Sequence, residues 1–171
     1  MLTKQGNKMT KNEFVSKRIK NNGQLLIDEI DMKILKILSK GSRISNREIA
    51  RMMGLSVNTV ISRIGNLEAT NVIKGYRAAI DFEKLGYGVT AIIGVVLNKN
   101  IIKEIEKEIA KSPNVCIVYD VTGRFDAVLI AKFKNTNELS DFVKSIYRKG
   151  FIESTETSVV LNNMKEDFSL P

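Results

Sequence analysis

The chain of 171 residues contains no histidine, no tryptophan and only one cysteine. Histidine is the commonest general base and the commonest ligand of transition metals, so its absence removes both options. One cysteine cannot form an internal disulfide, and without histidine it supports neither a structural zinc site nor a Cys-His nucleophile pair. No pair of carboxylates has a spacing that indicates catalysis. We therefore expect no catalytic residues, no metal and no cofactor.

The single cysteine, Cys116, lies in the apolar run Val115–Tyr119. We expect a buried, inert thiol there rather than a reactive one.

Long apolar runs are also missing. No stretch approaches the roughly 20 apolar residues that cross a bilayer, and Met1–Gln24 holds many charges but no apolar block of the kind found in secretion signals. Hydrophobic residues make up 43% of the chain and charged residues 27%, which is typical of a globular protein. We therefore expect a cytoplasmic protein.

Acidic residues are scarce in the N-terminal part of the chain. Residues 1–27 hold six Lys/Arg and one acid, residues 28–80 hold nine and five, and residues 81–171 hold twelve and thirteen. The formal charge of +8 therefore resides before residue 81. A basic part joined to a near-neutral part favours contact of the first with a polyanion such as nucleic acid.

Residues 1–25 are polar and rich in lysine and asparagine. We expect a basic arm that adds phosphate contacts. The alternative is a short helix around Phe14, Val15 and Ile19 that packs on a partner chain.

Residues 26–80 carry the pattern of three short helices. Apolar residues recur at helical spacing in Leu26–Leu38, with Asp28, Glu29 and Asp31 near the start and Gly41 after the end. Ser45 and Glu48 fit a capping box before the second helix, and Ser56 fits the cap of the third. Gly54 lies where a tight turn needs positive φ. The buried stripe of the third helix is predicted to be Val57, Val60, Ile61, Ile64 and Leu67.

After this domain the pattern changes to strands. Val72–Ile80 is predicted to be extended or a small wing, and 81–88 a linker. Strands are expected at Val89–Leu97, Val115–Thr122, Ala127–Phe133 and Glu153–Leu161, and helices at Ile101–Ala110 and Asn137–Arg148. The order βαββαβ is that of a ferredoxin-like domain over residues 89–162, followed by a C-terminal tail, 163–171. The fold class is α+β, a winged-type helix-turn-helix joined to a ferredoxin-like domain.

Several motifs resemble the Lrp/AsnC, or feast/famine, family of transcriptional regulators, and their order and spacing span residues 26–162. They are Asp28-Glu29-Ile30-Asp31, Arg47-Glu48-Ile49-Ala50, Gly54-Leu55-Ser56, Arg63-Ile64-x-x-Leu67-Glu68, Val72-Ile73 and Thr122-Gly123-Arg124-Phe125-Asp126. The resemblance implies dimers built on the C-terminal sheets, often assembled into octamers, that bind pseudo-palindromic operators in double-stranded DNA. It also implies an effector, mostly an amino acid, near the Thr-Gly-x-x-Asp loop.

A helix-turn-helix places its second helix in the major groove with N-terminal residues at the base edges. Asn58 is the best candidate for a base reader, because its amide pairs with adenine through two hydrogen bonds. Arg63 is expected to hold a phosphate. The full set of expected DNA contacts is Arg43, Ser45, Arg47, Ser56, Asn58, Thr59, Ser62, Arg63, Asn66 and Lys74. The alternative is that these are the solvated polar faces of a small helical domain.

Two positions depart from the family pattern. Gly65 lies where the family commonly has a basic residue, so we expect one phosphate contact fewer. Glycine inside a helix also costs ~1 kcal/mol relative to alanine. Asn71 lies where glycine usually follows the third helix, and asparagine is the next best residue for the left-handed conformation.

The expected effector site is the loop Gly123, Arg124, Phe125 and Asp126, with Thr155 and Thr157 lining the same cleft. Arg124 can meet a carboxylate and Asp126 an amino group. The alternative is a plain hairpin in which Gly123 makes the turn and Asp126 bonds its own loop. β-Branched residues such as Ile92, Val95 and Val159 offer more apolar surface than two helices cover, which favours a sheet-to-sheet dimer.

Two other functions compete with a regulator. Ferredoxin-like domains host many chemistries, so an enzyme is one alternative, although the lack of histidine argues against it. An architectural DNA-binding protein without an effector is the other, and it would show a steep salt dependence with little sequence preference.

Overall fold

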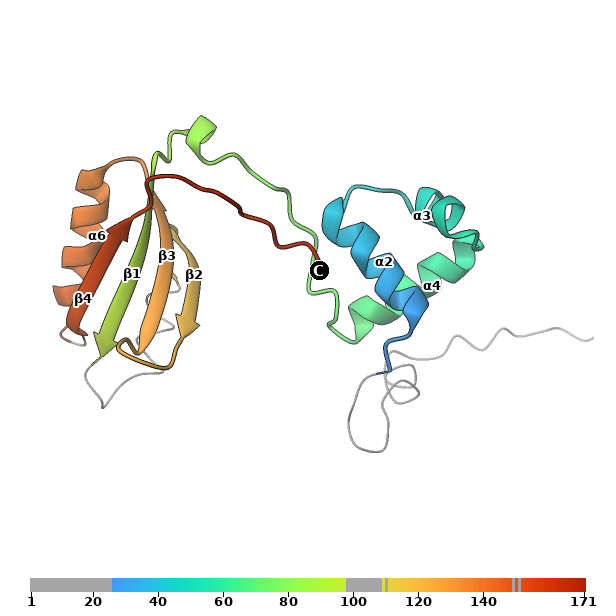
Figure 1. Ribbon diagram of the computed structural model, residues 1–171, viewed down its shortest axis with the longest axis horizontal. Coiled ribbons are helices and arrows are strands. Elements are labelled where there is room, and N and C mark those ends of the chain that lie inside the picture. The colour runs from blue at the N-terminus through green and yellow to red at the C-terminus, as the bar shows by residue number, and fades with distance from the viewer. Residues whose placement is uncertain (1–25, 98–108, 110, 149, 151) are drawn as a thin grey trace, which may run out of the picture. The chain divides into compact units, whose positions relative to one another are not determined.

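The computed structural model describes residues 26–97, 109, 111–148, 150 and 152–171 (Figure 1). The expected basic arm, 1–25, and nearly all of the helix expected at Ile101–Ala110 lie outside these residues. The chain divides into two compact units, one formed by residues up to Ala79 together with Asp167–Pro171, the other by Ile80–Glu166. In the described part of the chain, none of the helices combines the length and apolar character needed to cross a membrane.

The first unit contains the three predicted helices, α2 (Glu29–Lys40), α3 (Asn46–Met53) and α4 (Val57–Ala69). Each begins at a side chain that accepts a backbone N–H: Asp28 for α2, Ser45 for α3 and Ser56 for α4. These caps satisfy donors that a helix leaves without an internal partner. The full reciprocal capping box is at Asp28 and Asp31, whereas the Glu48 carboxylate bonds Arg51.

The helix ends explain why α3 and α4 turn where they do. Gly54 ends α3 with φ +63°, and Asn71 follows α4 with φ +56°. At Asn71 the N–H groups of Asn71 and Val72 donate to the carbonyls of Glu68 and Leu67, which is the Schellman arrangement. Both left-handed residues are those that the sequence analysis predicts.

The core of this unit is small, and its buried residues come from all three helices: Ile34, Ile49, Ala50, Val60, Ile64 and Leu67. The prediction that Val57 and Ile61 belong to this core is wrong. Val57 is 36% exposed and Ile61 is 49% exposed, because the buried stripe of α4 follows Val60, Ile64 and Leu67 and leaves the flank of the helix uncovered.

An ion pair network ties the start of α2 to α4. The Asp31 side chain is completely buried, and Arg63 Nη1 lies 3.3 Å from its Oδ1. The same nitrogen bonds the Asp28 carboxylate. Hydrogen bonding to Asp28, together with Asp31, raises the pKa of Arg63 despite partial burial. A buried carboxylate is tolerated when it is paired in this way, so Arg63 sets the position of α4 against α2.

The chain beyond α4 has no strand between Val72 and Ile80, so the expected wing is an irregular segment. Part of the expected linker is folded: Glu83–Leu85 forms a 3-10 turn, η1, whose N–H at Lys84 is accepted by Asp81. The Lys132 ammonium lies 4.9 Å from the centre of the Phe82 ring, which anchors this segment to the sheet of the second unit.

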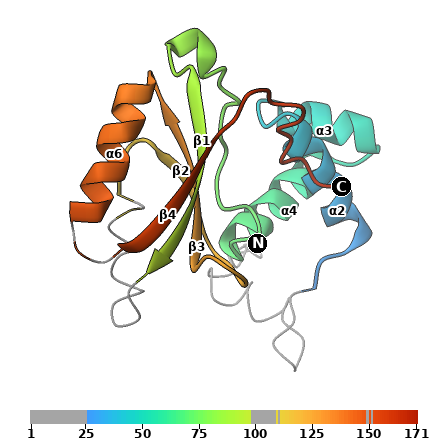
Figure 2. The same cartoon turned by 60° about the vertical axis from the view of Figure 1, so that its left-hand side comes forward.

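The second unit is an antiparallel sheet in the order β2-β3-β1-β4 (Figures 1 and 2). Its strands are β1 (Val89–Leu97), β2 (Val115–Asp120), β3 (Ala127–Phe133) and β4 (Ile152–Val159). Helix α6 (Thr136–Arg148) packs on one face of the sheet, and the buried, helical Ile109 joins the same core. This is the predicted ferredoxin-like strand order, and the α+β prediction is confirmed.

Alternation along the strands separates two faces of the sheet. Ala91, Ile93, Val95 and Leu97 of β1 are buried in the core beneath α6, whereas Ile92 is 42% exposed on the opposite face. The open face also presents Tyr119, which pairs with Val128 across β2 and β3. Three details of the prediction are wrong. Val95 is buried on the helix-covered face, and Val159 pairs with Ala91 and so shares that face. Cys116 is exposed rather than buried.

Replacing Arg63 by alanine leaves the Asp31 carboxylate buried without its guanidinium. We expect Arg63→Ala to lower the free energy of unfolding of the N-terminal unit by about 2–4 kcal/mol. Arg51→Ala is the matched control, because its ion pair with Glu48 is solvent-exposed and should contribute far less. Urea unfolding followed by circular dichroism measures both. Equal effects of the two substitutions would contradict a structural role for Arg63.

Candidate nucleic-acid interface and effector loop

The exposed flank of α4 is the principal candidate for contact with a ligand in the first unit. Its N-terminal half presents Val57, Asn58, Ile61 and Ser62, all exposed. Residues four apart lie one above the other on a helix, so Val57 with Ile61, and Asn58 with Ser62, form two adjacent rows. This is the part of a recognition helix that meets base edges in a helix-turn-helix.

The two serine caps have structural roles that limit their freedom. Ser45 Oγ accepts from the Glu48 N–H at 3.1 Å. Ser56 Oγ accepts from the Thr59 N–H at 3.0 Å and lies 2.8 Å from Thr59 Oγ1. The expected contacts at Ser45, Ser56 and Thr59 therefore involve hydroxyls already engaged in capping, and Thr59 is half-buried.

The position of Arg63 argues against the phosphate contact that the sequence predicts. Its side chain is on the flank of α4 that faces α2, where it bonds Asp28 and Asp31. Only 23% of the side chain is exposed. Two carboxylates already neutralise the guanidinium, so we assign Arg63 to the packing of the helices and not to the DNA-binding surface.

The other cations expected to contact DNA are exposed, unlike Arg63. Arg47 is exposed in the first turn of α3, and Lys74 is exposed beyond α4. Asn66 is half-buried towards the end of α4, where its carbonyl accepts from Thr70. Arg43 is exposed in the loop between α2 and α3.

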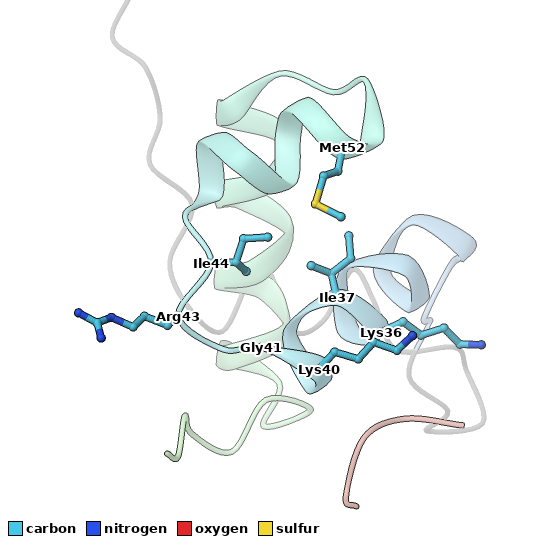
Figure 3. Close-up of a pocket in the computed structure, with 7 residues that line it drawn as sticks. All are labelled: Lys36, Ile37, Lys40, Gly41, Arg43, Ile44 and Met52. Carbon is cyan, nitrogen blue, oxygen red and sulfur yellow. The ribbon is translucent and has the colours of Figure 1, made fainter. Parts of the chain in front are cut away.

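A shallow hollow of about 520 Å³ lies beside this loop, lined by Lys36, Ile37, Lys40, Gly41, Arg43, Ile44 and Met52. Figure 3 shows Ile37, Ile44 and Met52 converging, while the Arg43 side chain extends away from them. No buried polar or titratable group lines the hollow. It therefore lacks the convergent polar groups that orient a small ligand, and Arg43 remains directed to the outside.

The segment after α4 is held by Tyr76. Its hydroxyl donates to Glu68 Oε1 at 2.8 Å. Desolvation, followed by the hydrogen bond to Glu68, raises the pKa of Tyr76 to about 12. The phenol is therefore protonated at neutral pH and keeps donating, which fixes the backbone near Lys74 against the end of α4.

In the second unit, the loop 121–126 between β2 and β3 folds over the open face of the sheet. A Cβ built on Gly94 would lie 2.7 Å from three atoms of the Phe125 ring, so the ring rests on the bare backbone of β1. The Arg124 guanidinium lies 5.3 Å from the centre of that ring and 2.9 Å from Glu156 Oε2. Gly123 makes the turn with φ +114°.

Asp126 attaches the loop to β1. Its N–H donates to the Val95 carbonyl at 2.9 Å, and its Oδ2 accepts from the Leu97 N–H at 2.7 Å. These bonds continue the β1–β3 ladder beyond the pair Val95–Ala127. One carboxylate oxygen of Asp126 thus has a structural role, but it bonds the backbone of β1, whereas the plain-hairpin alternative expects a bond within its own loop.

Thr155 and Thr157 do not share the surface of this loop. They pair with Val95 and Ile93 across β1 and β4, so they belong to the helix-covered face. Thr155 Oγ1 lies 3.2 Å from the Tyr147 hydroxyl of α6. The expected cleft joining these threonines to Gly123–Asp126 is therefore not formed within one chain. The residues that do contact this loop are Gly94 and Glu156. The sequence did not indicate either of them, because neither belongs to a local motif.

No group of three or more His, Cys, Asp or Glu residues capable of holding a metal ion occurs in the described part of the chain.

Comparison with known families decides the identity of both units. The winged helix-turn-helix DNA-binding family matches residues 27–74, and the Lrp/AsnC ligand binding domain matches residues 90–170. The chain belongs to the Lrp/AsnC family. The resemblance drawn from the sequence motifs is thus confirmed, and this Lrp/AsnC protein is a transcriptional regulator, not an enzyme.

Relatives match over nearly their whole length. An uncharacterized HTH-type transcriptional regulator of Pyrococcus abyssi is 46% identical over 145 residues, covering 85% of this chain and 99% of the relative. The HTH-type transcriptional regulator FL11 of Pyrococcus horikoshii is 39% identical over 145 residues, covering 85% and 96%.

Solved structures agree with this assignment. A transcriptional regulator of Neisseria meningitidis, determined as a complex with L-Met, has a TM-score of 0.80 and 28% identity, covering 85% of this chain and 96% of its own. AsnC of E. coli has a TM-score of 0.74 and 27% identity, covering 82% and 96%.

The contact between Gly94 and Phe125 is open to a direct test. Gly94→Ala should displace the ring and destabilise the second unit by about 1–2 kcal/mol, because the added methyl overpacks the site. Gly65→Ala is the matched control: its Cβ would meet nothing within 4 Å, so it should stabilise α4 by up to about 1 kcal/mol. Thermal unfolding gives the sign of each change. A stabilising Gly94→Ala would contradict the packing of Phe125 on β1.

Proposed function

We propose that this Lrp/AsnC regulator acts in the cytoplasm as a homodimer that recognises a pseudo-palindromic operator through α4. An amino acid bound beside the loop Gly123–Asp126 would modulate that binding. The observation that carries the proposal is the uncovered flank at the N-terminal half of α4, which presents both polar and apolar side chains. The unit that holds α4 carries nine Lys/Arg and five acids in residues 28–79.

The DNA contacts divide into two kinds. Asn58 and Ser62, exposed on α4, are the proposed base readers. Arg43, Arg47 and Lys74 are exposed around the helix-turn-helix and are the proposed phosphate contacts, which set affinity and its salt dependence but not sequence.

The open face of the sheet supports a dimer. Ile92 and Tyr119 are 42% and 53% exposed there, and Ile117, Val128 and Ile130 are half-buried beside them. A second sheet packed on this face would remove that apolar area from water. Self-association through one face gives the twofold symmetry that matches two half-sites about 34 Å apart.

Amino-acid binding is supported by the chemistry of the effector loop and by the Neisseria relative, which was determined with L-Met. The Arg124 side chain is 76% exposed. Replacing its ion pair with Glu156 by one with a ligand carboxylate therefore costs little free energy. Because the loop rests on the proposed dimer face, a bound effector would act on how two chains pack.

The decisive experiment is footprinting on the DNA upstream of the protein's own gene, against random DNA at physiological salt, with each of the twenty amino acids added in turn. We expect a protected site with twofold symmetry and a preference of at least about 10³ over random DNA. Asn58→Ala should reduce that preference, whereas Lys36→Ala, on α2, should not. At least one amino acid should shift the affinity, and Arg124→Ala should abolish the shift. Equal affinity for both DNAs would favour an architectural protein.

Sedimentation of Ile92→Asp tests the dimer. A charge placed in the middle of the open face would be buried on association, so the variant should sediment as a monomer at concentrations where the wild type is dimeric. Val159→Asp is the matched control, since Val159 is 45% exposed but shares the face of Ala91. A dimeric Ile92→Asp variant would place the interface elsewhere.

A further inference from the structure

The exposed flank of α4 carries an apolar row that the fold does not use. Val57, Ile61 and Gly65 follow one another at intervals of four residues and are all exposed, although the first two have branched apolar side chains. Neither Val57 nor Ile61 belongs to the core of the unit or packs against it as a partly buried residue. Both side chains are therefore available for contact with a partner outside this unit.

The neighbours of this row indicate what covers it. Asn58 and Ser62 form the adjacent row on the same helix, and both are exposed. Protein–protein interfaces are depleted in serine relative to the rest of the surface, whereas here polar and apolar side chains alternate around the N-terminal half of α4. That half begins at the Ser56 cap, where a recognition helix meets the edges of base pairs.

The major-groove edge of an A·T pair matches this pattern. Thymine presents its 5-methyl group there, and adenine presents the N7 acceptor and the N6 donor. An apolar side chain contacts the methyl, and an asparagine amide pairs with adenine. A G·C pair would place polar groups against Val57 and Ile61, which offer them no hydrogen bond, so that these groups would lose water without compensation.

We propose that Val57 and Ile61 determine specificity by contacting the 5-methyl groups of thymines in each operator half-site. Asn58 reads adenine beside them. Gly65 continues the same row. A Cβ there would meet nothing within 4 Å, so the packing of α4 does not require a glycine at this position. The missing side chain lets the helix backbone approach the groove closely. This proposal rests on the proposed recognition of DNA by α4.

Replacement of thymine by deoxyuridine in the footprinted half-site tests the methyl contacts, because it removes the methyl and leaves base pairing unchanged. Fluorescence anisotropy with the full-length protein should show that affinity falls about fourfold for each contacted methyl, the value for one buried carbon. Ile61→Ala and Val57→Ala should lose a similar factor on the thymine operator. On the deoxyuridine operator, the same variants should lose nothing further.

Met32→Ala is the control, since Met32 is exposed on α2, away from this row. It should bind both operators like the wild type. In thermal unfolding, the α4 variants should keep the stability of the wild type, because these side chains lie outside the core.

The outcomes separate this inference from the proposed function. A symmetric protected site combined with indifference to every thymine-to-deoxyuridine change overturns the methyl contacts and leaves the regulator intact. Equal losses of the variants on both operators also overturn them, because the methyl would then be read by another residue. The absence of any preferred site would instead overturn sequence-specific binding itself.

Discussion

The carboxylate of Asp31 is completely buried at the first turn of α2, and a buried charge has to be paired. Arg63 reaches it from α4 and also bonds Asp28. This contact fixes the rotation of α4: the flank with Arg63 faces α2, the stripe of Val60, Ile64 and Leu67 faces the core, and the remaining flank is left uncovered. The surface that we propose for DNA is thus a consequence of how one buried acid is neutralised.

A comparable constraint shapes the second unit. Gly94 leaves bare backbone on the open face of β1, the Phe125 ring rests on it, and Asp126 bonds the backbone of β1. The loop that presents Arg124 is therefore part of the surface on which we propose that two chains meet. Effector binding and dimerisation would share one face, while α6 covers the other face over the core. We propose that a small ligand bound there would change how two chains pack.

The described α-helices, the order of the strands along the chain and the family could be predicted from the sequence because each rests on local patterns. Ser45 and Ser56 cap helices, and Gly54 and Asn71 follow helix ends, through bonds and backbone angles set within a few residues. Alternation identifies strands. The candidate DNA site was predicted less well. Periodicity shows which side of α4 is apolar, but Val57 and Ile61 lie at the edge of that stripe, and only packing decides whether an edge is covered. Cys116 was misplaced for the same reason.

The sequence by itself determined the two-part organisation, the position of α4 after a tight turn and the turn at Gly123, because these depend on residues a few positions apart. Only the tertiary structure decided that Arg63 serves the helix packing, that Phe125 lies on Gly94, and that Thr155 and Thr157 belong to the opposite face from the effector loop. Each of these pairs residues about 30 positions apart or depends on strand register. Such contacts depend on which faces meet once the core has formed, and local propensities carry no information about that.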